Sequence, residues 1–310
     1  MTASSAWRKS CCANDKTIFS QTIIPASSRL LYYWATEMLD MDDKKTLLVT
    51  GATKNTGWAI ARRFAADGWN VVLTSRDAAS AETAAAKLKA EFSSVDALGV
   101  AMNPAKVVDI RIAFAAAKER FGRIDAFVNN AAHLGVGMSV LNSTEADWDA
   151  VMNANARAAF FGSQEAVKLM EGGGSIVYIS SCHAKRTIPG RALYTASKAA
   201  IGGIARALAL ELGCLGIRVN AILAGAIRTD RWDGLTDVEV AARRARWPAG
   251  IESTPDEIAA MVAYLCSDAA RTITGAEIPV DSGIGVSLLQ YNKDWMKNDP
   301  NNAKYWGKKK

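Results

Sequence analysis

The sequence predicts an α/β fold in which helices cover both faces of a doubly wound parallel sheet. Short runs of apolar and β-branched residues alternate with long Ala-rich stretches of helical spacing, and the runs are apolar at nearly every position. Strands of that kind are buried on both faces, as in parallel sheets. No internal repeat or linker interrupts the alternation. We therefore expect a single domain at 44–286, an N-terminal extension at 1–43 and a C-terminal extension at 287–310.

The first strand is expected at Lys45–Thr50, and the first helix, Trp58–Ala66, stops at Gly68, since glycine commonly follows the last turn of a helix. The elements that follow keep the alternation. In chain order we expect strand Val71–Ser75, helix Ala79–Phe92, strand Ala97–Ala101, helix Pro104–Phe121, strand Asp125–Asn129, helix Glu145–Met170, strand Ser175–Ser180, helix Leu193–Gly213 and strand Arg218–Ile222.

The last helix has the clearest start. Thr254 can cap it, Pro255 occupies its first position, and Glu257 can reach back to complete a capping box. The strand Glu277–Val280 closes the series of elements.

The net charge of +6 is concentrated at the chain ends. Residues 291–310 carry six Lys against two Asp, and residues 1–40 carry four Lys or Arg against three acids. The body of the chain is close to neutral. A surface for nucleic acid would need basic residues clustered on a folded face, so no nucleic-acid partner is expected.

Cysteine usage and hydropathy indicate the compartment. The five cysteines are odd in number and have no paired metal-ligand spacing, which favours a reduced, cytoplasmic environment without a bound metal. No run of 18 apolar residues occurs, so no membrane span is expected. Residues 1–36 are rich in Ser, Thr and Ala and hold one acid, as in an organellar transit peptide. The favoured alternative is an upstream start codon or a disordered leader, because Met38 and Met41 both stand just before the first strand.

A glycine-containing loop follows the first strand and precedes a helix. In a Rossmann fold this is where the backbone turns sharply and the pyrophosphate of a dinucleotide meets the helix N-terminus. Asn55 stands between the two glycines and is among the residues that best tolerate a positive φ. The candidate cofactor contacts here are Gly51, Thr53, Lys54, Asn55, Thr56 and Gly57.

The end of the second strand indicates which dinucleotide binds. NAD sites place an acid there for the ribose 2′-hydroxyl, whereas this chain has Ser75 and Arg76. The Arg76 guanidinium can pair with a 2′-phosphate, and Lys54 adds a second positive charge. The sequence therefore predicts NADP(H). The alternative is that Arg76 is only a surface residue at the start of a helix.

Tyr194 and Lys198 lie four residues apart on an expected helix, so their side chains share a face. A phenol with a pKa of about 10 must become more acidic to exchange protons near neutrality, and a neighbouring ammonium favours that change. The spacing alone carries little weight, because Tyr305 and Lys309 repeat it without any supporting motif.

Six motifs give this pair its context, and together they resemble the short-chain dehydrogenase/reductase family over residues 46–283. In the glycine loop, Asn55 replaces the family's middle glycine. Ala132 replaces the glycine of an NNAG motif and Ala224 the proline of a PG motif. In order, the motifs are Thr50–Gly57, Asn129–Ala132, Asn155, Ser181 with Tyr194 and Lys198, Arg218–Ala221, and Ala224–Gly225.

The resemblance implies a role for each catalytic residue. Tyr194 would exchange the proton, Lys198 would lower the Tyr pKa and bind the nicotinamide ribose, Ser181 would orient the substrate, and Asn155 would hold a relay water. No metal is implied. The resemblance also implies cofactor contacts at Tyr194, Lys198, Asn129, Ala131, Gly225, Ile227 and Thr229.

Substrate contacts are expected at Ser181, His183 and Tyr194, with the segment 226–251 as the variable substrate-binding region. His133 and His183 both follow family motifs, and each is either a pocket residue or a loop residue bonded to backbone. Cys182 is expected to be a packed small residue rather than a nucleophile.

The function expected from this pattern is hydride transfer between NADP(H) and a carbonyl or secondary alcohol. Alternatives are a 3-oxoacyl-thioester reductase, since the chain resembles 3-oxoacyl-carrier-protein reductase-like members, and a non-catalytic NADP-sensing Rossmann protein. The helices bearing Asn155 and Tyr194 are expected to form a homodimer or homotetramer. Four large aromatics in 288–306 favour packing of this tail on a neighbouring subunit or over the cleft.

Overall fold

The computed structural model describes residues 44–287. The predictions for the N-terminal extension and for the tail beyond residue 287 lie outside the described residues. Within 44–287, no helix is both long enough and apolar enough to cross a membrane.

The described chain forms one parallel sheet of seven strands, which confirms the predicted fold class. The strands are β1 (Thr46–Val49), β2 (Asn70–Ser75), β3 (Ala97–Ala101), β4 (Ala126–Asn129), β5 (Gly174–Ile179), β6 (Ile217–Ala224) and β7 (Glu277–Val280). Their order across the sheet is β3-β2-β1-β4-β5-β6-β7. All the predicted strands are found, with bounds that shift by at most two residues.

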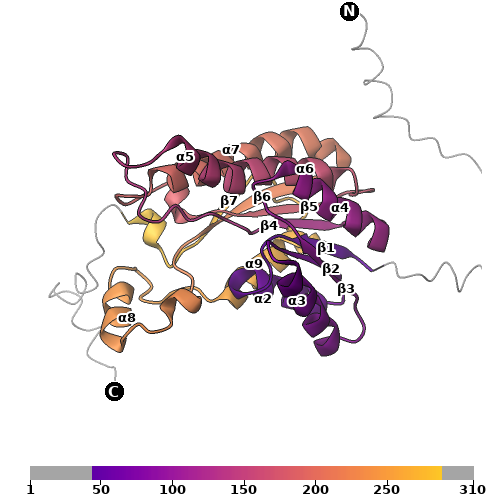
Figure 1. Cartoon of the computed structure of the whole chain (residues 1–310), viewed down its shortest axis with the longest axis horizontal. Helices are drawn as coiled ribbons and strands as arrows, with labels where there is room; N and C mark the ends of the chain where they lie inside the picture. The colour runs from indigo at the N-terminus through magenta and orange to yellow at the C-terminus, as the bar shows by residue number, and fades with distance from the viewer. Residues whose placement is uncertain (1–43, 288–310) are drawn as a thin grey trace, which may run out of the picture. The chain divides into compact units, whose positions relative to one another are not determined.

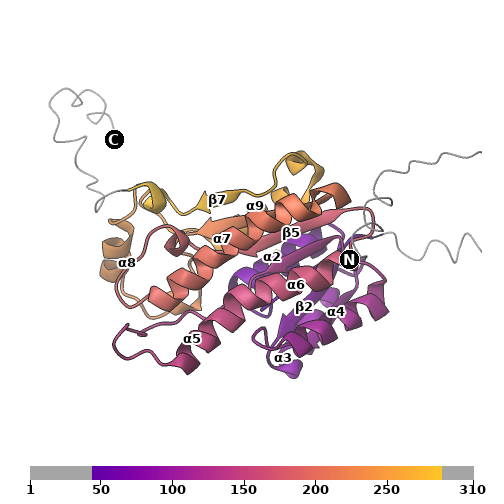
Figure 2. The same ribbon diagram turned by 90° about the horizontal axis from the view of Figure 1, so that it is seen from above.

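Helices cover both faces of this sheet (Figure 1). On one face lie α2 (Asn55–Ala66), α3 (Ala78–Glu91) and α9 (Pro255–Cys266), and on the other α4 (Val107–Phe121), α5 (Glu145–Met152), α6 (Ala158–Val167) and α7 (Ala192–Leu212). A further helix, α8 (Asp237–Arg244), lies at the edge of the fold (Figure 2).

Each strand supplies side chains to two cores because its residues alternate between the faces. Leu47 and Val49 of β1 pack with α2, α3 and α9, whereas Leu48 packs with α4, α6 and α7. All three are fully buried. This explains why the strands read as unbroken apolar runs in the sequence.

The strand order reverses direction between β1 and β4, and this position determines where a ligand can bind. In an open parallel sheet the connections leave in opposite directions at such a point, and a crevice opens at the carboxyl ends of the strands. The chain leaves β1 into the glycine loop and leaves β4 into Asn130, while β5 leads into Ser180 and Ser181. The candidate residues therefore meet at one edge of the sheet.

Two helix predictions are corrected by the structure, and the helix expected at Trp58–Ala66 begins earlier, at Asn55. The expected helix Glu145–Met170 is interrupted by a π-helical turn, Asn153–Arg157, which contains Asn155. The helix expected from Pro104 begins at Val107, because the Asn103 side chain accepts a hydrogen bond from the Ala105 amide and forms a turn there. The helix α8 was not predicted.

The capping box predicted at Thr254 is confirmed. The Glu257 amide donates to Thr254 Oγ1 at 3.2 Å, and the Thr254 amide donates to Glu257 Oε2 at 2.6 Å. Two donors at the helix end are thus satisfied by each other's side chains.

Candidate active site

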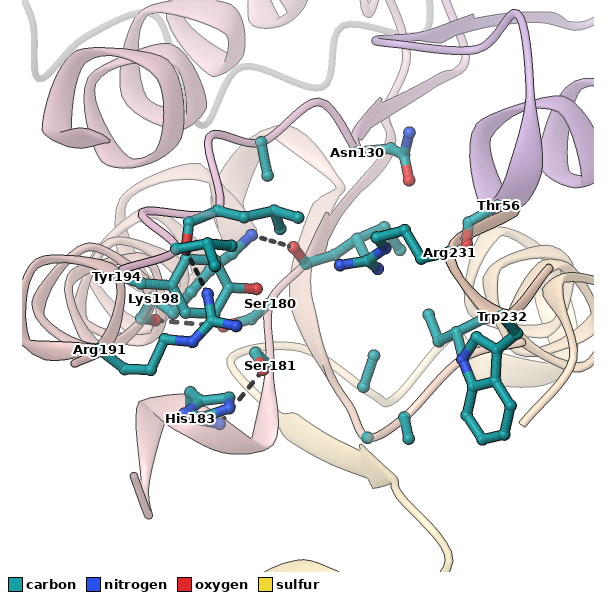
Figure 3. Close-up of a pocket in the computed structure, with 18 of the residues that line it drawn as sticks. Thr56, Asn130, Ser180, Ser181, His183, Arg191, Tyr194, Lys198, Arg231 and Trp232 are labelled. Carbon is teal, nitrogen blue, oxygen red and sulfur yellow. Dashed lines mark hydrogen bonds between the residues drawn. The ribbon is translucent and has the colours of Figure 1, made fainter. Parts of the chain in front are cut away.

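A cavity of about 500 Å³ opens at the carboxyl edge of the sheet (Figure 3). Its walls come from elements far apart in the sequence: Thr56 on α2, the loop after β4, the ends of β5 and β6, and helix α7. Three of the four predicted catalytic residues, Ser181, Tyr194 and Lys198, line it. Such a concave site with convergent polar groups is suited to a small substrate and a cofactor.

Tyr194 lies edge-on to His183, with the ring centroids 5.7 Å apart. Burial raises the pKa of Tyr194, and a hydrogen bond with Ser181 opposes that rise. The charges of Arg191 and Arg231 also lower this pKa. The phenol is therefore protonated near neutrality and can donate a proton.

Lys198 is buried, and its ammonium donates a hydrogen bond to the Ile179 carbonyl oxygen at 2.7 Å. Desolvation lowers the pKa of Lys198 from 10.5 to about 8. Its Nζ lies 5.7 Å from the centroid of the Tyr194 ring. The ammonium donates to the Ile179 carbonyl, and the arginines Arg191 and Arg231 lower the pKa of the phenol; the expected action of Lys198 on Tyr194 stays a prediction.

Asn155 is fully buried in the π-helical turn and does not line the cavity. Its amide nitrogen donates to the His133 carbonyl and to Ser197 Oγ, both at 2.9 Å, and its oxygen accepts from the His133 amide at 2.7 Å. Both side-chain donors are thus used within the protein. The side chain ties the loop after β4 to α7, and the helix then holds Tyr194 and Lys198 in place.

The glycine loop has the conformation that the sequence predicted. Gly51 has φ +63° and Asn55 has φ +50°, which confirms that Asn55 takes the left-handed conformation of the missing glycine. A Cβ on Gly57 would lie 2.3 Å from the Gly51 carbonyl oxygen, so a side chain there is excluded. The close approach of Gly57 to Gly51 places the first turn of α2 directly against the loop, which is the arrangement of a phosphate-binding helix N-terminus.

An ionic bracket, which we define as Lys54, Asn55 and Asp230, joins this loop to the segment 226–251. Lys54 Nζ lies 2.7 Å from Asp230 Oδ2, and Asn55 Nδ2 donates to Asp230 Oδ1 at 3.0 Å. The Asp230 amide donates back to Asn55 Oδ1 at 3.2 Å. These contacts lower the pKa of Asp230. Lys54, predicted to meet a 2′-phosphate, is therefore paired with a carboxylate.

Arg76 is exposed just after β2, as the NADP(H) prediction requires. Asp77 caps α3 by accepting from the Ser80 amide at 2.8 Å, so Arg76 itself has no capping task. Within residues 44–287, Arg76 makes no hydrogen bond or ion pair. Its guanidinium is accordingly available to a ligand.

Asn129 was predicted to contact the cofactor, but its side chain is sealed from the cavity. It is 1% exposed, and neither its side-chain nitrogen nor its oxygen has a partner among the described residues. Asn130 lines the cavity instead, and its Nδ2 donates to the Gly51 carbonyl at 3.0 Å. The reason is strand alternation, since Asn129 is the last residue of β4 and lies on the same face as Phe127.

Some of the other predicted cofactor contacts line the cavity and others do not. Gly225 and Ile227 line it, together with Thr56. The remaining predicted contacts, Gly51, Thr53, Ala131 and Thr229, lie on the same loops but do not form part of its wall.

The two histidines differ in position. His183 lines the cavity, and burial together with the charge of Arg191 lowers its pKa, so the ring is neutral near pH 7. His133 does not line it, and its ring Nδ1 accepts from the Gly135 amide at 3.2 Å. His133 is thus the loop residue of the two alternatives. Burial raises the pKa of the Cys182 thiol, as expected of a packed residue rather than a nucleophile.

The sequence did not single out Ser180 and Arg191 of the cavity wall, whereas other members of the wall belong to the segment 226–251 that was expected to bind substrate. Among the described residues, no group of three or more His, Cys, Asp or Glu side chains is placed to hold a metal ion. Arg191 had no motif around it, whereas the position of 226–251 after the PG motif was a usable signal for its members. The additional lining residues include Ser180, Arg191, Arg231, Trp232, Arg243 and Trp247.

Comparison with known proteins agrees with this geometry. A family model described as enoyl-(acyl carrier protein) reductase matches residues 51–285. Dehydrogenase/reductase SDR family member 4 of Bos taurus is 35% identical over 247 residues, which cover 78% of this chain and 87% of that protein. The 3beta-hydroxysteroid dehydrogenase 1 of Eggerthella lenta is 37% identical over 246 residues, covering 77% and 93%.

A solved structure gives the same result. The blue fluorescent protein from a metagenomic library, in complex with NADPH, is 34% identical with a TM-score of 0.71, covering 77% of this chain and 97% of that one. The chain belongs to the short-chain dehydrogenase/reductase family. As a member it is an oxidoreductase that acts on hydroxyl or carbonyl groups with a nicotinamide cofactor.

Proposed function

We propose that this protein catalyses reversible hydride transfer between NADP(H) and a carbonyl or secondary alcohol. The observation that supports this most directly is that Ser181, Tyr194 and Lys198 line one cavity beside a glycine loop that opens a helix. The site thus combines a proton donor, a hydroxyl that can orient the substrate, and a loop suited to phosphate. Assigning a reaction class from geometry requires such groups to lie together.

The residues present fit a dinucleotide. The loop backbone at Gly51 and Gly57 and the N-terminus of α2 would hold the pyrophosphate, and Lys198 with Ile227 would flank the nicotinamide end. A bound NADPH would supply the hydride for reduction.

The protein groups supply the proton. Tyr194 donates its phenolic proton to the carbonyl oxygen as hydride reaches the carbon, and the two together give the alcohol. Ser181 hydrogen-bonds the same oxygen and orients it. Lys198, with its pKa near 8, returns a proton to the phenolate. In oxidation each step runs in reverse. Asn155 acts as a positioning residue for the loop and α7.

Preference for NADP(H) over NAD(H) is tested at Arg76. The Arg76→Ala variant is expected to raise the KM for NADPH by about 10- to 100-fold, because a charge-assisted bond of roughly 1.5–3 kcal/mol to the 2′-phosphate is lost. The KM for NADH should change less than threefold. Steady-state kinetics with both cofactors measure this, with Arg62→Ala on the same face as a surface control. An equal rise for both cofactors would assign Arg76 a structural role.

The general assay is NADPH oxidation by purified protein across a panel of ketones, aldehydes and 3-oxoacyl thioesters. Turnover of simple carbonyls supports the proposal, and turnover restricted to 3-oxoacyl thioesters supports the thioester-reductase alternative. Cofactor binding by titration without turnover of any compound would favour an NADP sensor.

We also propose that the protein is a homodimer or homotetramer. Trp148 on α5 and Phe160 on α6 are each more than 40% exposed, which leaves apolar area for a neighbouring copy on the face that bears Asn155. Mass measurement in solution tests this directly.

A further inference from the structure

All the charged side chains that line the cavity are basic. Its lining contains the side chains of Arg191, Lys198, Arg231 and Arg243, whereas no Asp or Glu of residues 44–287 lines it. The whole chain has a modest excess of basic residues, so this concentration is a property of the site rather than of the composition.

Neighbouring arginines are neutralised, but those in the cavity are not. Arg228 and Arg244 both pair with the buried Glu252, at 3.1 Å and 2.6 Å, and they hold its pKa at about 2. By contrast, no carboxylate within the described ranges lies within ion-pair distance of Arg191 or Arg231. Their hydrogen bonds go to the Leu134 carbonyl at 2.8 Å and to Thr229 Oγ1 at 3.4 Å, both neutral acceptors.

Arg243 is a weaker candidate for a cation without a nearby carboxylate. Glu239 stands one helical turn before it on α8, and the charge of Arg243 helps to lower the pKa of Glu239. That carboxylate is already engaged in capping, accepting from the Thr236 amide at 2.8 Å. Arg191 and Arg231 are therefore the two arginines of the wall that form no ion pair among the described residues, since Asp230, next to Arg231 in the chain, is held by Lys54 and Asn55.

These two arginines lie on either side of the reacting position. Figure 3 shows Arg191 and Arg231 extending toward the cavity from opposite sides, with Ser180 and Ser181 between them. The Arg191 guanidinium lies 5.9 Å from the centroid of the Tyr194 ring, and the charges of both arginines lower the pKa of Tyr194. Unpaired guanidinium groups at such a place attract an anion strongly.

Beside the basic and the catalytic polar side chains, part of the wall is apolar. Trp232 and Trp247 are buried with ring centroids 6.0 Å apart, and the Arg243 guanidinium lies 5.2 Å from the Trp232 ring centroid. Leu134 and Val136 line the other side. The site therefore combines two free cations with a hydrophobic surface for the body of a ligand.

We propose that the substrate carries a carboxylate or phosphate group in addition to its carbonyl or alcohol, and that Arg191 and Arg231 bind this anionic group. The inference rests on the proposed hydride transfer and specifies its substrate class as oxo acids or oxo phosphates with an apolar body. An amphipathic anion of this kind matches each surface of the cavity.

The test compares matched substrates. Each oxo acid of a panel is assayed beside its methyl ester, and each oxo phosphate beside its neutral phosphate triester. The kcat/KM of the anionic form is expected to exceed that of the neutral form by at least tenfold. Which anionic series reacts faster distinguishes carboxylate from phosphate.

Arginine variants locate the effect. Arg231→Gln is expected to lower kcat/KM for the anionic substrate by about 10- to 100-fold, with a change below threefold for the ester. Arg231→Lys should restore part of the loss. Arg246→Gln is the matched control, because Arg246 is exposed on the same segment and outside the cavity wall. The KM for NADPH should stay unchanged in Arg231→Gln. A rise in that KM with unaltered acid selectivity would assign Arg231 to the cofactor phosphates and overturn the proposal.

A binding measurement without turnover tests the anion site independently of the proposed hydride transfer. Quenching of tryptophan fluorescence by phenylacetate and by phenylacetamide is compared in the wild type, Arg191→Gln and Arg231→Gln. Tighter binding of the acid that both variants lose supports the anion site even if no compound is turned over, in which case the hydride-transfer function alone fails. Equal binding of acid and amide, or equal kcat/KM of acids and esters, would show that the site does not select anions.

Discussion

Replacing Tyr194 by Phe is expected to lower kcat by about 10²- to 10⁴-fold, the usual contribution of a general acid–base. The change removes only the transferable proton, because the ring keeps its edge-on contact with His183 and its place on α7. Binding of NADPH, measured by titration, should remain within threefold of the wild type. Steady-state and single-turnover kinetics measure the loss.

Tyr264→Phe supplies the control, since Tyr264 is exposed on α9, on the opposite face of the sheet. That variant should keep full activity. If Tyr194→Phe retained more than a tenth of wild-type kcat, Tyr194 would not be the proton donor and the assignment of this site would be wrong.

Replacing Lys198 by Met is expected to abolish most of the activity and yet raise the free energy of unfolding. Burial lowers the pKa of Lys198 from 10.5 to about 8, which corresponds to a cost of about 3 kcal/mol for keeping the charged form in the folded state near neutrality. Methionine fills a similar volume without a charge. Loss of the hydrogen bond to Ile179 destabilises the variant by about 1 kcal/mol. The free energy of unfolding is therefore expected to be about 2 kcal/mol higher than that of the wild type at pH 7.

The pH dependence identifies the cause of that gain. Between pH 8 and 10.5 the unfolded lysine binds more protons than the folded one, so the stability of the wild type rises with pH through this window relative to the variant. The advantage of Lys198→Met should therefore be full below pH 8 and fade toward pH 10.5. Urea unfolding at several pH values measures the difference. A constant advantage would attribute the gain to packing, and a loss of stability at pH 7 would contradict the buried charge.

Much of the fold could be predicted because its elements have local causes. The strands are buried on both faces, so Leu47, Leu48 and Val49 gave an apolar run without any interruption. The positive φ of Asn55 followed from the tolerance of its side chain for that conformation. Thr254 and Glu257 indicated a helix start because the side chain of each can accept a hydrogen bond from the backbone amide of the other.

Other features have causes that local patterns do not contain. A π-helical turn at Asn153–Arg157 inserts a residue without changing the composition of the helix, so a periodicity argument passes over it. The partner of Lys54 lies 176 residues away in Asp230, in a segment with no motif. The burial of Asn129, by contrast, could have been predicted, because alternation along β4 places its side chain on the same face of the sheet as that of Phe127.

The ionic bracket has a consequence for how the two ligands of this enzyme communicate. Asp230 contacts the loop proposed to hold the phosphates and is the chain neighbour of Arg231, which lines the cavity. If a cofactor phosphate competed for Lys54, as we propose, it would release Asp230 and so change the freedom of Arg231 beside it. By thermodynamic reciprocity, a substrate that fixes this arginine alters cofactor affinity by the same factor. In this proposal the carboxylate of Asp230 would couple the two ligand sites.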